Sequence, residues 1–139
     1  MKAHLTRRYV LAASHRLHSD QLSDEENRLT FGKCNNPHGH GHNYAVEVTV
    51  SGQVSPSTGM VCDLVELDEC FRREIMDRFD HENLSTRPEF TNLVPTTENL
   101  AIEIFDILKR EFRAAHLEKV RIEETQNNSF EYCGESQLS

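Results

Sequence analysis

Histidines alternate with glycines in the segment His38-Gly-His40-Gly-His42, directly ahead of a stretch rich in β-branched residues. If strand geometry extends back through this segment, the three imidazoles point to one face, because side chains alternate with period two along a strand. A further histidine, His15, ends an earlier stretch with strand character. Two histidines from one strand and one from its neighbour predict a zinc site of three neutral ligands with an open fourth position. Spacing alone leaves a second interpretation open, a histidine-rich surface loop with incidental metal affinity.

Cys34 lies on the same polar segment, six residues before His40. A thiol near a metal ion and imidazoles has a lowered pKa, which makes Cys34 a candidate general base or nucleophile. A fourth zinc ligand, which would make the site structural, and a buried thiol without a role are the alternatives. The other cysteines form no Cys-x-x-Cys pair, so neither a zinc ribbon nor a thioredoxin-type motif is present.

Three other polar groups could move protons or bind a ligand. In Asp80-His81 the carboxylate can orient the imidazole as in a proton relay, although on these two residues alone a histidine at the negative C-terminal end of a helix is the favoured explanation. Glu123-Glu124 falls in a predicted strand, so one carboxylate lies on each face of the sheet, and a buried one needs N–H donors from a ligand. Thr96-Thr97-Glu98 is more often only a helix cap.

Hydrophobic periodicity predicts six elements in the order ββααββ. The expected strands are residues 4–15, 44–50, 120–125 and 130–132, and the expected helices begin at the capping residues Asp63 and Thr96. Strands grouped at both ends of the chain around two helices predict an α+β fold, an antiparallel four-stranded sheet with both helices on one face. Residues 16–41 predict a long loop, which is uncommon in a compact domain unless it is functional.

The open edges of such a sheet favour pairing with another subunit, so we expect a homo-oligomer. The sequence has no repeat, low-complexity tract or linker, which predicts a single domain over residues 1–139.

Fifteen Lys and Arg against 23 Asp and Glu give a net charge of −8, which argues against a nucleic-acid or anionic-membrane partner. An anionic small substrate is not excluded, because a pocket can be locally positive. No apolar run approaches the roughly 18–20 residues that span a bilayer, and the first apolar stretch is too short for a secretory signal. We therefore expect a cytoplasmic protein.

Taken together, these residues resemble the 6-pyruvoyl-tetrahydropterin synthase family over nearly the whole chain. The motifs are Ala-Ser-His15-Arg-Leu, Phe31-Gly-Lys-Cys34-Asn-Asn-Pro-His-Gly-His40-Gly-His42-Asn-Tyr44, Asp80-His81-Glu-Asn-Leu84, Thr96-Thr97-Glu98-Asn99 and Glu124-Thr125-Gln-Asn-Asn128. The resemblance implies the tunnelling fold (T-fold), in which the sheets of ββααββ subunits join into a trimeric barrel and two trimers form a hexamer.

The resemblance also implies a role for each candidate residue. His15, His40 and His42 would bind Zn²⁺, and Cys34 would be the catalytic base. Asp80 and His81 would complete the proton-transfer group across a subunit interface, and Glu124 would anchor the pterin, with Thr96, Thr97 and Glu98 nearby. The implied reaction converts 7,8-dihydroneopterin triphosphate to 6-pyruvoyl-tetrahydropterin with elimination of triphosphate, the work of a carbon–oxygen lyase.

The family pattern usually has Asn where this chain has His38, and this difference creates a second possible frame. The related 6-carboxy-tetrahydropterin synthase spaces its motif as Cys-x-x-x-His-Gly-His, which would select Cys34, His38 and His40. Asn43-Tyr44 directly after His42 favours the first frame. The carboxy-forming reaction and a non-catalytic zinc- or pterin-binding module remain the alternatives. Lys33 and Arg16 are candidates to neutralise the triphosphate by position only.

Overall fold

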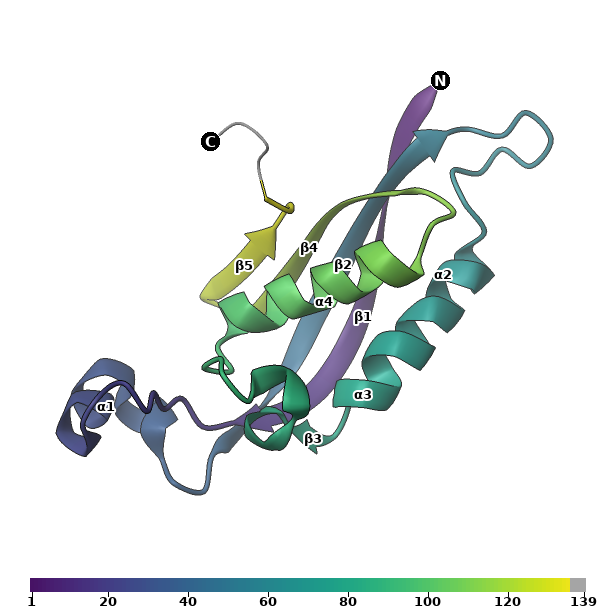
Figure 1. Ribbon diagram of the computed structural model, residues 1–139. Helices are drawn as coiled ribbons and strands as arrows, with labels where there is room; N and C mark the ends of the chain where they lie inside the picture. Colours follow the sequence, from purple (N-terminus) through teal and green to yellow (C-terminus); the bar gives the residue numbers. More distant parts are fainter. Residues whose placement is uncertain (136–139) are drawn as a thin grey trace.

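A five-stranded sheet forms one layer of the protein (Figure 1). The computed structural model describes residues 1–135, so the last four residues of the expected domain, 136–139, lie outside the described part. The strands are β1 (Lys2–His15), β2 (His40–Gln53), β3 (Glu82–Asn83), β4 (His116–Thr125) and β5 (Asn128–Tyr132), in the spatial order β3-β1-β2-β4-β5. None of the helices within residues 1–135 is long and apolar enough to cross a membrane.

The four long strands are antiparallel and follow the predicted order, and a fifth, short strand departs from the prediction. β3 has only two residues and pairs in parallel with β1, placing Glu82 beside Ala13 and Asn83 beside Ser14. Two residues carry no periodicity, so the sequence gives no signal for this strand. Because β3 covers only the end of β1, the rest of that edge has no strand partner within the described residues.

Strands β1 and β2 pair over their full length, and this register determines which residues meet. It begins with Lys2 opposite Gln53 and ends with His15 opposite His40. The fully buried apolar residues of both strands, Leu11 and Tyr44 among them, point to one face, whereas Val10 is exposed on the other. His15, His40 and His42 share that face, because side chains alternate with period two.

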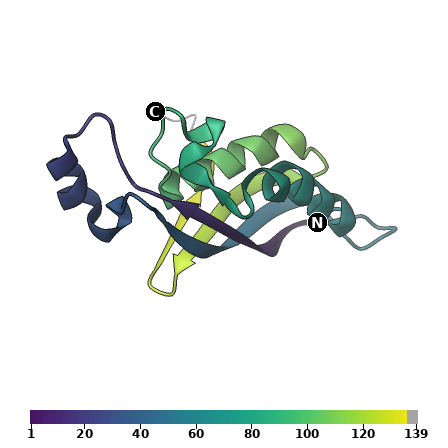
Figure 2. The same ribbon diagram turned by 90° about the horizontal axis from the view of Figure 1, so that it is seen from below.

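Two helical segments cover this face of the sheet, as predicted (Figures 1 and 2). The first comprises α2 (Leu64–Phe71), a π-helical turn (Arg72–Met76) and α3 (Asp77–Phe79), and the second is α4 (Thr97–Glu111). Their buried stripes meet the inner face of the sheet in one core, whose fully buried members include Val46, Val48, Leu67, Phe71, Ile75, Ile104 and Ile122. A π-helical turn holds more residues than an α-helical one, so it changes the direction in which the following residues leave the helix.

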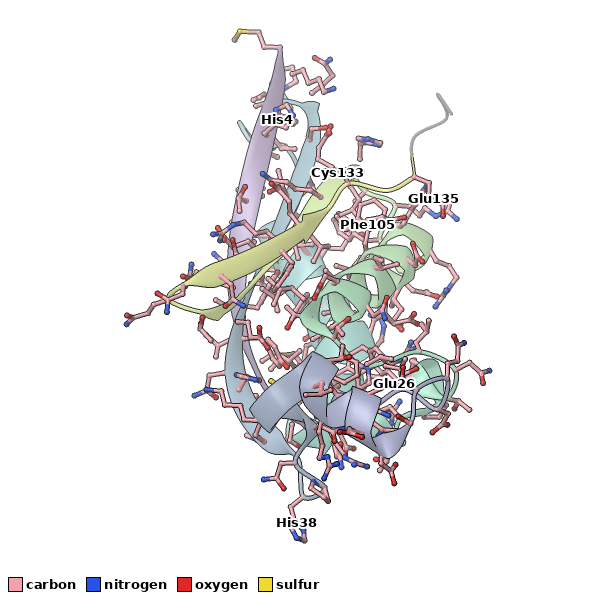
Figure 3. The ribbon with its side chains drawn as sticks, turned by 90° about the vertical axis from the view of Figure 1, so that its left-hand side faces the viewer. His4, Glu26, His38, Phe105, Cys133 and Glu135 are labelled. Atoms are coloured by element: carbon pink, nitrogen blue, oxygen red, sulfur yellow. The ribbon has the colours of Figure 1, made fainter. Side chains whose placement is uncertain are left out.

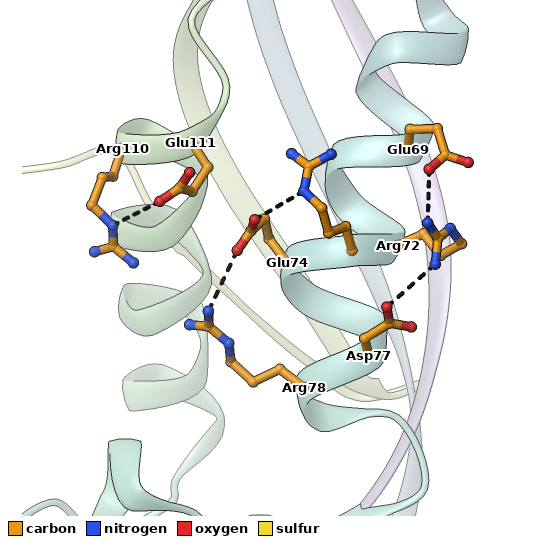
Figure 4. A network of polar contacts seen from close by, with 8 residues as sticks. Glu69, Arg72, Glu74, Asp77, Arg78, Arg110 and Glu111 are labelled. Carbon is orange, nitrogen blue, oxygen red and sulfur yellow. Dashed lines mark hydrogen bonds and ion pairs between the residues drawn. The ribbon is translucent and has the colours of Figure 1, made fainter.

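Ion pairs line the exposed side of the π-helical turn (Figure 4). Arg72 donates to Glu69 at 2.8 Å and to Asp77 at 3.2 Å, while Glu74 accepts from Arg73 at 3.0 Å and from Arg78 at 3.4 Å. Exposed pairs of this kind each contribute about 0–1 kcal/mol, so the turn depends mainly on its buried face, which includes Ile75.

The prediction of a structureless loop over residues 16–41 is wrong. This segment contains α1 (Asp24–Phe31) and a 3₁₀ turn (Gly32–Asn35), which lie beyond the end of the sheet and apart from α2 and α4 (Figure 1). The helix begins with a capping box, in which Ser23 Oγ accepts from Glu26 N and Glu26 Oε1 accepts from Ser23 N. The Ser-x-x-Glu spacing is visible in the sequence, but no apolar stripe follows it.

Candidate functional site

Three histidines converge at the end of the β1–β2 pair nearest α1. The ligand atoms of His15, His40 and His42 lie within 4.8 Å of one another. The strand register produces this cluster, because His15 faces His40 directly and His42 follows two residues later on the same side. His15 is fully buried, and the other two rings are partly covered. The three rings are therefore placed as ligands to a single metal ion.

The hydrogen bonds around the rings leave nitrogens available to an ion. His15 Nδ1 lies 2.7 Å from the carbonyl oxygen of Pro95. A carbonyl can only accept, so Nδ1 carries the proton and the lone pair of Nε2 faces the cluster. Within residues 1–135, Nε2 of His15, Nδ1 of His40 and Nε2 of His42 are buried without a hydrogen-bond partner. Orphaned buried nitrogens fit a metal site better than a hydrogen-bonded core.

Burial favours the neutral form of two of these imidazoles, His15 and His40. Desolvation lowers the pKa of His15 and of His40, and the neighbouring imidazoles add to the effect on both rings. Neutral imidazole is the form that binds a metal ion, so the protein environment favours metal binding over protonation.

Glu124 places a carboxylate beside the cluster. Its Oε1 lies 3.3 Å from His42 Nε2 and 3.9 Å from His15 Nε2, and its Oε2 accepts from Asn128 Nδ2 at 3.1 Å. The neighbouring Glu123 points to the other face of the sheet and pairs with Arg8 at 3.2 Å. The expectation of one carboxylate on each face is thus confirmed. Asn128, which orients Glu124, is a contact that sequence reasoning did not single out.

The start of α4 forms another wall of the site, because Pro95 contacts His15. Thr96 Oγ1 caps the helix by accepting from Asn99 N at 3.1 Å, which is the role that the sequence pattern favours. Thr97 is buried, and its hydroxyl has no hydrogen-bond partner among the described residues. Glu98 is exposed. Of these three, Thr97 is the one that is buried beside Tyr44.

Tyr44 was not predicted as a site residue, although its spacing from His42 could have indicated it. The side chain is fully buried, and its hydroxyl lies 3.4 Å from His15 Nδ1. Burial raises its pKa, and the nearby Glu124 carboxylate and Cys34 thiol add to the effect. The Tyr44 hydroxyl therefore stays protonated at neutral pH.

Cys34 lies half-buried in the 3₁₀ turn that follows α1. Its carbonyl oxygen accepts from Leu17 N at 2.8 Å, which joins the turn to the chain just after His15. Gly39 closes the same loop with a φ of +73°, and a Cβ there would meet the carbonyl oxygen of His15 at 3.1 Å. These contacts hold the turn that carries Cys34 against the end of β1.

Asp80 and His81 lie at the β1 edge. Asp80 Oδ1 accepts from Ala12 N at 3.0 Å, and its Oδ2 lies 3.6 Å from His81 Nε2. The imidazole of His81 is 81% exposed, in a groove of about 350 Å³ whose lining includes Ala12, Ser14, Gly41 and Asn43. The lining also includes Ala13 and His42, so the groove borders one member of the histidine cluster. Within residues 1–135 no hydrogen bond or ion pair joins this pair to Cys34.

His38 does not share a face with His40 and His42, contrary to the expectation for an extended strand. It precedes the first residue of β2 and is exposed, and its backbone N–H donates to Asn36 Oδ1. Figure 3 shows its side chain at the tip of the loop, pointing away from the body of the protein. The cluster therefore contains His40 and His42 and leaves His38 out.

Comparison with known proteins supports this architecture. The family model described as 6-pyruvoyl tetrahydropterin synthase matches residues 4–135. The chain belongs to this family.

Its relatives are similar over most of their length. The chain is 50% identical to the 6-pyruvoyl tetrahydrobiopterin synthase of Homo sapiens over 135 residues, covering 96% of this chain and 93% of the human protein. The solved structure of Caenorhabditis elegans 6-pyruvoyl tetrahydropterin synthase aligns with a TM-score of 0.93 at 44% identity, covering 97% of each chain. A protein of Archaeoglobus fulgidus, provisionally named 6-carboxy-5,6,7,8-tetrahydropterin synthase, is 35% identical over 88 residues, covering 63% of this chain and 70% of the relative.

Proposed function

We propose that this protein is a zinc-dependent 6-pyruvoyl-tetrahydropterin synthase. The reaction converts 7,8-dihydroneopterin triphosphate to 6-pyruvoyl-tetrahydropterin and eliminates triphosphate, which makes the enzyme a carbon–oxygen lyase. The observation that carries the proposal is the cluster of three imidazoles with orphaned buried nitrogens, next to the carboxylate of Glu124. Three neutral ligands with an open position are typical of catalytic zinc. Family membership supplies the substrate class.

The side chains around the cluster have separate tasks in this proposal. When bound, zinc supplies Lewis-acid polarisation of the substrate's side-chain oxygens. Glu124 accepts hydrogen bonds from the amino and ring N–H donors of the pterin, and Asn128 holds the carboxylate in position. The hydroxyl of Thr97 offers a further polar contact, since it has no partner within the described residues.

Proton transfer needs a base and an acid that reach the substrate's side chain. Cys34 removes a proton from carbon as the thiolate. His81, oriented by the Asp80 carboxylate, returns protons to the substrate. The enzyme needs no nicotinamide or flavin, because the pterin ring is reduced as the side chain is oxidised.

A second copy of the chain supplies Asp80 and His81 in this proposal. The His81 imidazole is 81% exposed, and within residues 1–135 no hydrogen bond or ion pair joins it or Asp80 to Cys34. Most of the β1 edge has no strand partner within residues 1–135, so it is free to extend the sheet into another subunit. We infer a homo-oligomer, with the hexamer built from two trimers as the family's arrangement.

The deciding experiment is an anaerobic incubation of the zinc-loaded protein with 7,8-dihydroneopterin triphosphate under reducing conditions. Mass spectrometry identifies the pterin product, and triphosphate release is measured in parallel for the wild type and Cys34→Ala. We expect a pyruvoyl product from the wild type and a rate lower by about 10²–10⁴-fold in the variant, the usual worth of a general base. Zinc content is measured for both proteins, so that a lost metal is not mistaken for a lost base.

Two results would contradict the proposal. A carboxy product with acetaldehyde would assign the protein to the 6-carboxy branch and leave the metal and base assignments in place. Tight pterin binding without triphosphate release would leave only the non-catalytic binding module.

A further inference from the structure

The distribution of ion pairs separates a few basic residues from the rest. Most Lys and Arg side chains contact a carboxylate, as Arg7 does with Asp68 and Arg121 with Glu47. The exceptions within residues 1–135 are Arg16, Arg28, Lys33, Lys109 and Arg113. In a protein with a net charge of −8, basic groups without carboxylate partners are unusual.

Three of these exceptions meet in one pocket. Arg16, Arg28 and Lys33 line a cavity of about 510 Å³ between α1, the 3₁₀ turn and the chain that leaves β1. Asp24 is the one acidic residue in its lining, and although it lies four residues before Arg28 on α1, the two form no ion pair. The pocket therefore has an excess of positive charge, with donors that no carboxylate of the described chain satisfies.

The local hydrogen bonds position the guanidinium of Arg16 without using all of its donors. Arg16 Nε donates to the carbonyl oxygen of Asn35 at 3.0 Å, and the terminal nitrogens have no recorded partner within residues 1–135. Asn35 is held in turn, because its Nδ2 donates to the carbonyl oxygen of Leu17 at 2.8 Å. An anchored guanidinium with free terminal N–H groups is suited to bidentate contact with phosphate oxygens.

The pocket adjoins the histidine cluster. Arg16 follows the buried His15 directly, and Lys33 precedes Cys34 in the 3₁₀ turn. Arg16 and Lys33 therefore join the basic pocket to the end of β1 that carries the cluster. A ligand held at the cluster could thus extend a polyanionic tail into the basic pocket.

We propose that Arg16, Arg28 and Lys33 bind the triphosphate of the substrate, and with it the free triphosphate product. This inference rests on the proposed function for the identity of the ligand, but the anion-binding property can be measured without any turnover. Three cations on separate segments match the several charged oxygens of a triphosphate, which one Lys or Arg cannot satisfy.

The test measures binding of inorganic triphosphate to the zinc-loaded protein by isothermal titration calorimetry. Arg28→Gln and Lys33→Gln each remove one charge from the pocket, and Lys109→Gln removes one unpaired charge elsewhere as the matched control. We expect each pocket variant to bind about tenfold more weakly, the usual worth of a charge-assisted hydrogen bond, and the control to bind as the wild type does. Arg28→Lys keeps the charge and should restore most of the affinity.

Inorganic triphosphate can also bind metal ions directly, so a metal-depleted variant, His42→Ala, is titrated alongside. Retained binding in this variant supports the pocket, whereas loss of binding would assign the anion to the metal and overturn the proposal. Equal affinities in Arg28→Gln, Lys33→Gln and Lys109→Gln would overturn it as well. Thermal melting of each variant confirms that it is folded.

Kinetics connect the pocket to the reaction. With 7,8-dihydroneopterin triphosphate, Arg28→Gln should raise KM about tenfold and leave kcat within about twofold, as expected when binding energy is lost equally from ground and transition states. Lowered kcat with unchanged KM would contradict a role in substrate binding. If the wild type forms no pterin product at all, the proposed function fails, while the titration still decides whether the pocket binds triphosphate.

Discussion

At the scale of single residues, the structure separates two histidines that differ little in the sequence. His42 belongs to the buried cluster, whereas His38 lies exposed in the loop before β2. Loss of a residue that only supports a metal ligand costs roughly 10–100-fold in metal affinity, so we expect His42→Ala, which removes a ligand, to weaken zinc binding by more than this. We expect His38→Ala to bind zinc as the wild type does. Zinc affinity measured by competition with a chromogenic chelator checks both. Zinc loss in His38→Ala would instead support the Cys34, His38, His40 frame.

At the scale of elements, α1 is the helix that hydrophobic periodicity failed to predict. The buried side-chain amide of Asn27 explains how α1 folds without an apolar stripe. Asn27 Oδ1 accepts from Ser19 N at 2.7 Å, and its Nδ2 donates to the carbonyl oxygens of Ser19 and Ser23. Asn27→Ala leaves Ser19 N without its acceptor, at about 1–3 kcal/mol, while both carbonyls keep a backbone N–H donor. We therefore expect faster amide exchange over residues 19–31 with little change in the rest of the protein. Hydrogen–deuterium exchange measures this, with the exposed Asn92→Ala as control. Unchanged exchange over 19–31 would show that α1 does not depend on this amide.

The elements that the sequence did predict are those with a regular burial pattern. β1, β2, α2 and α4 alternate or repeat their apolar residues with a clear period, because one face of each packs on a common core. The candidate metal site was predictable for the same reason, since strand alternation already aligns His40 with His42. The roles of Asn128 and Pro95 could not be predicted, because each acts through one hydrogen bond across the fold. Such a contact produces no periodic pattern in the sequence.

At the scale of the whole molecule, the placement of Asp80-His81 and Cys34 predicts how inactive variants behave in mixtures. If each site combines Cys34 of one copy with His81 of another, a mixed oligomer of Cys34→Ala and His81→Ala chains contains some sites with both wild-type residues. When equal amounts of the two chains pair at random, about a quarter of all sites have both wild-type residues. We therefore expect co-expressed variants to recover about a quarter of the wild-type rate, although each alone is nearly inactive.

The measurement compares the co-expressed mixture with a mixture of the two variants purified separately and combined without subunit exchange. Activity in the first and none in the second supports a site shared between copies. An inactive co-expressed mixture would mean that Cys34 and His81 act within one chain. His81 and Cys34 would then have to approach one another by movement of the β1 edge, which the hydrogen bond from Ala12 N to Asp80 and the pairing of β1 with β3 both oppose.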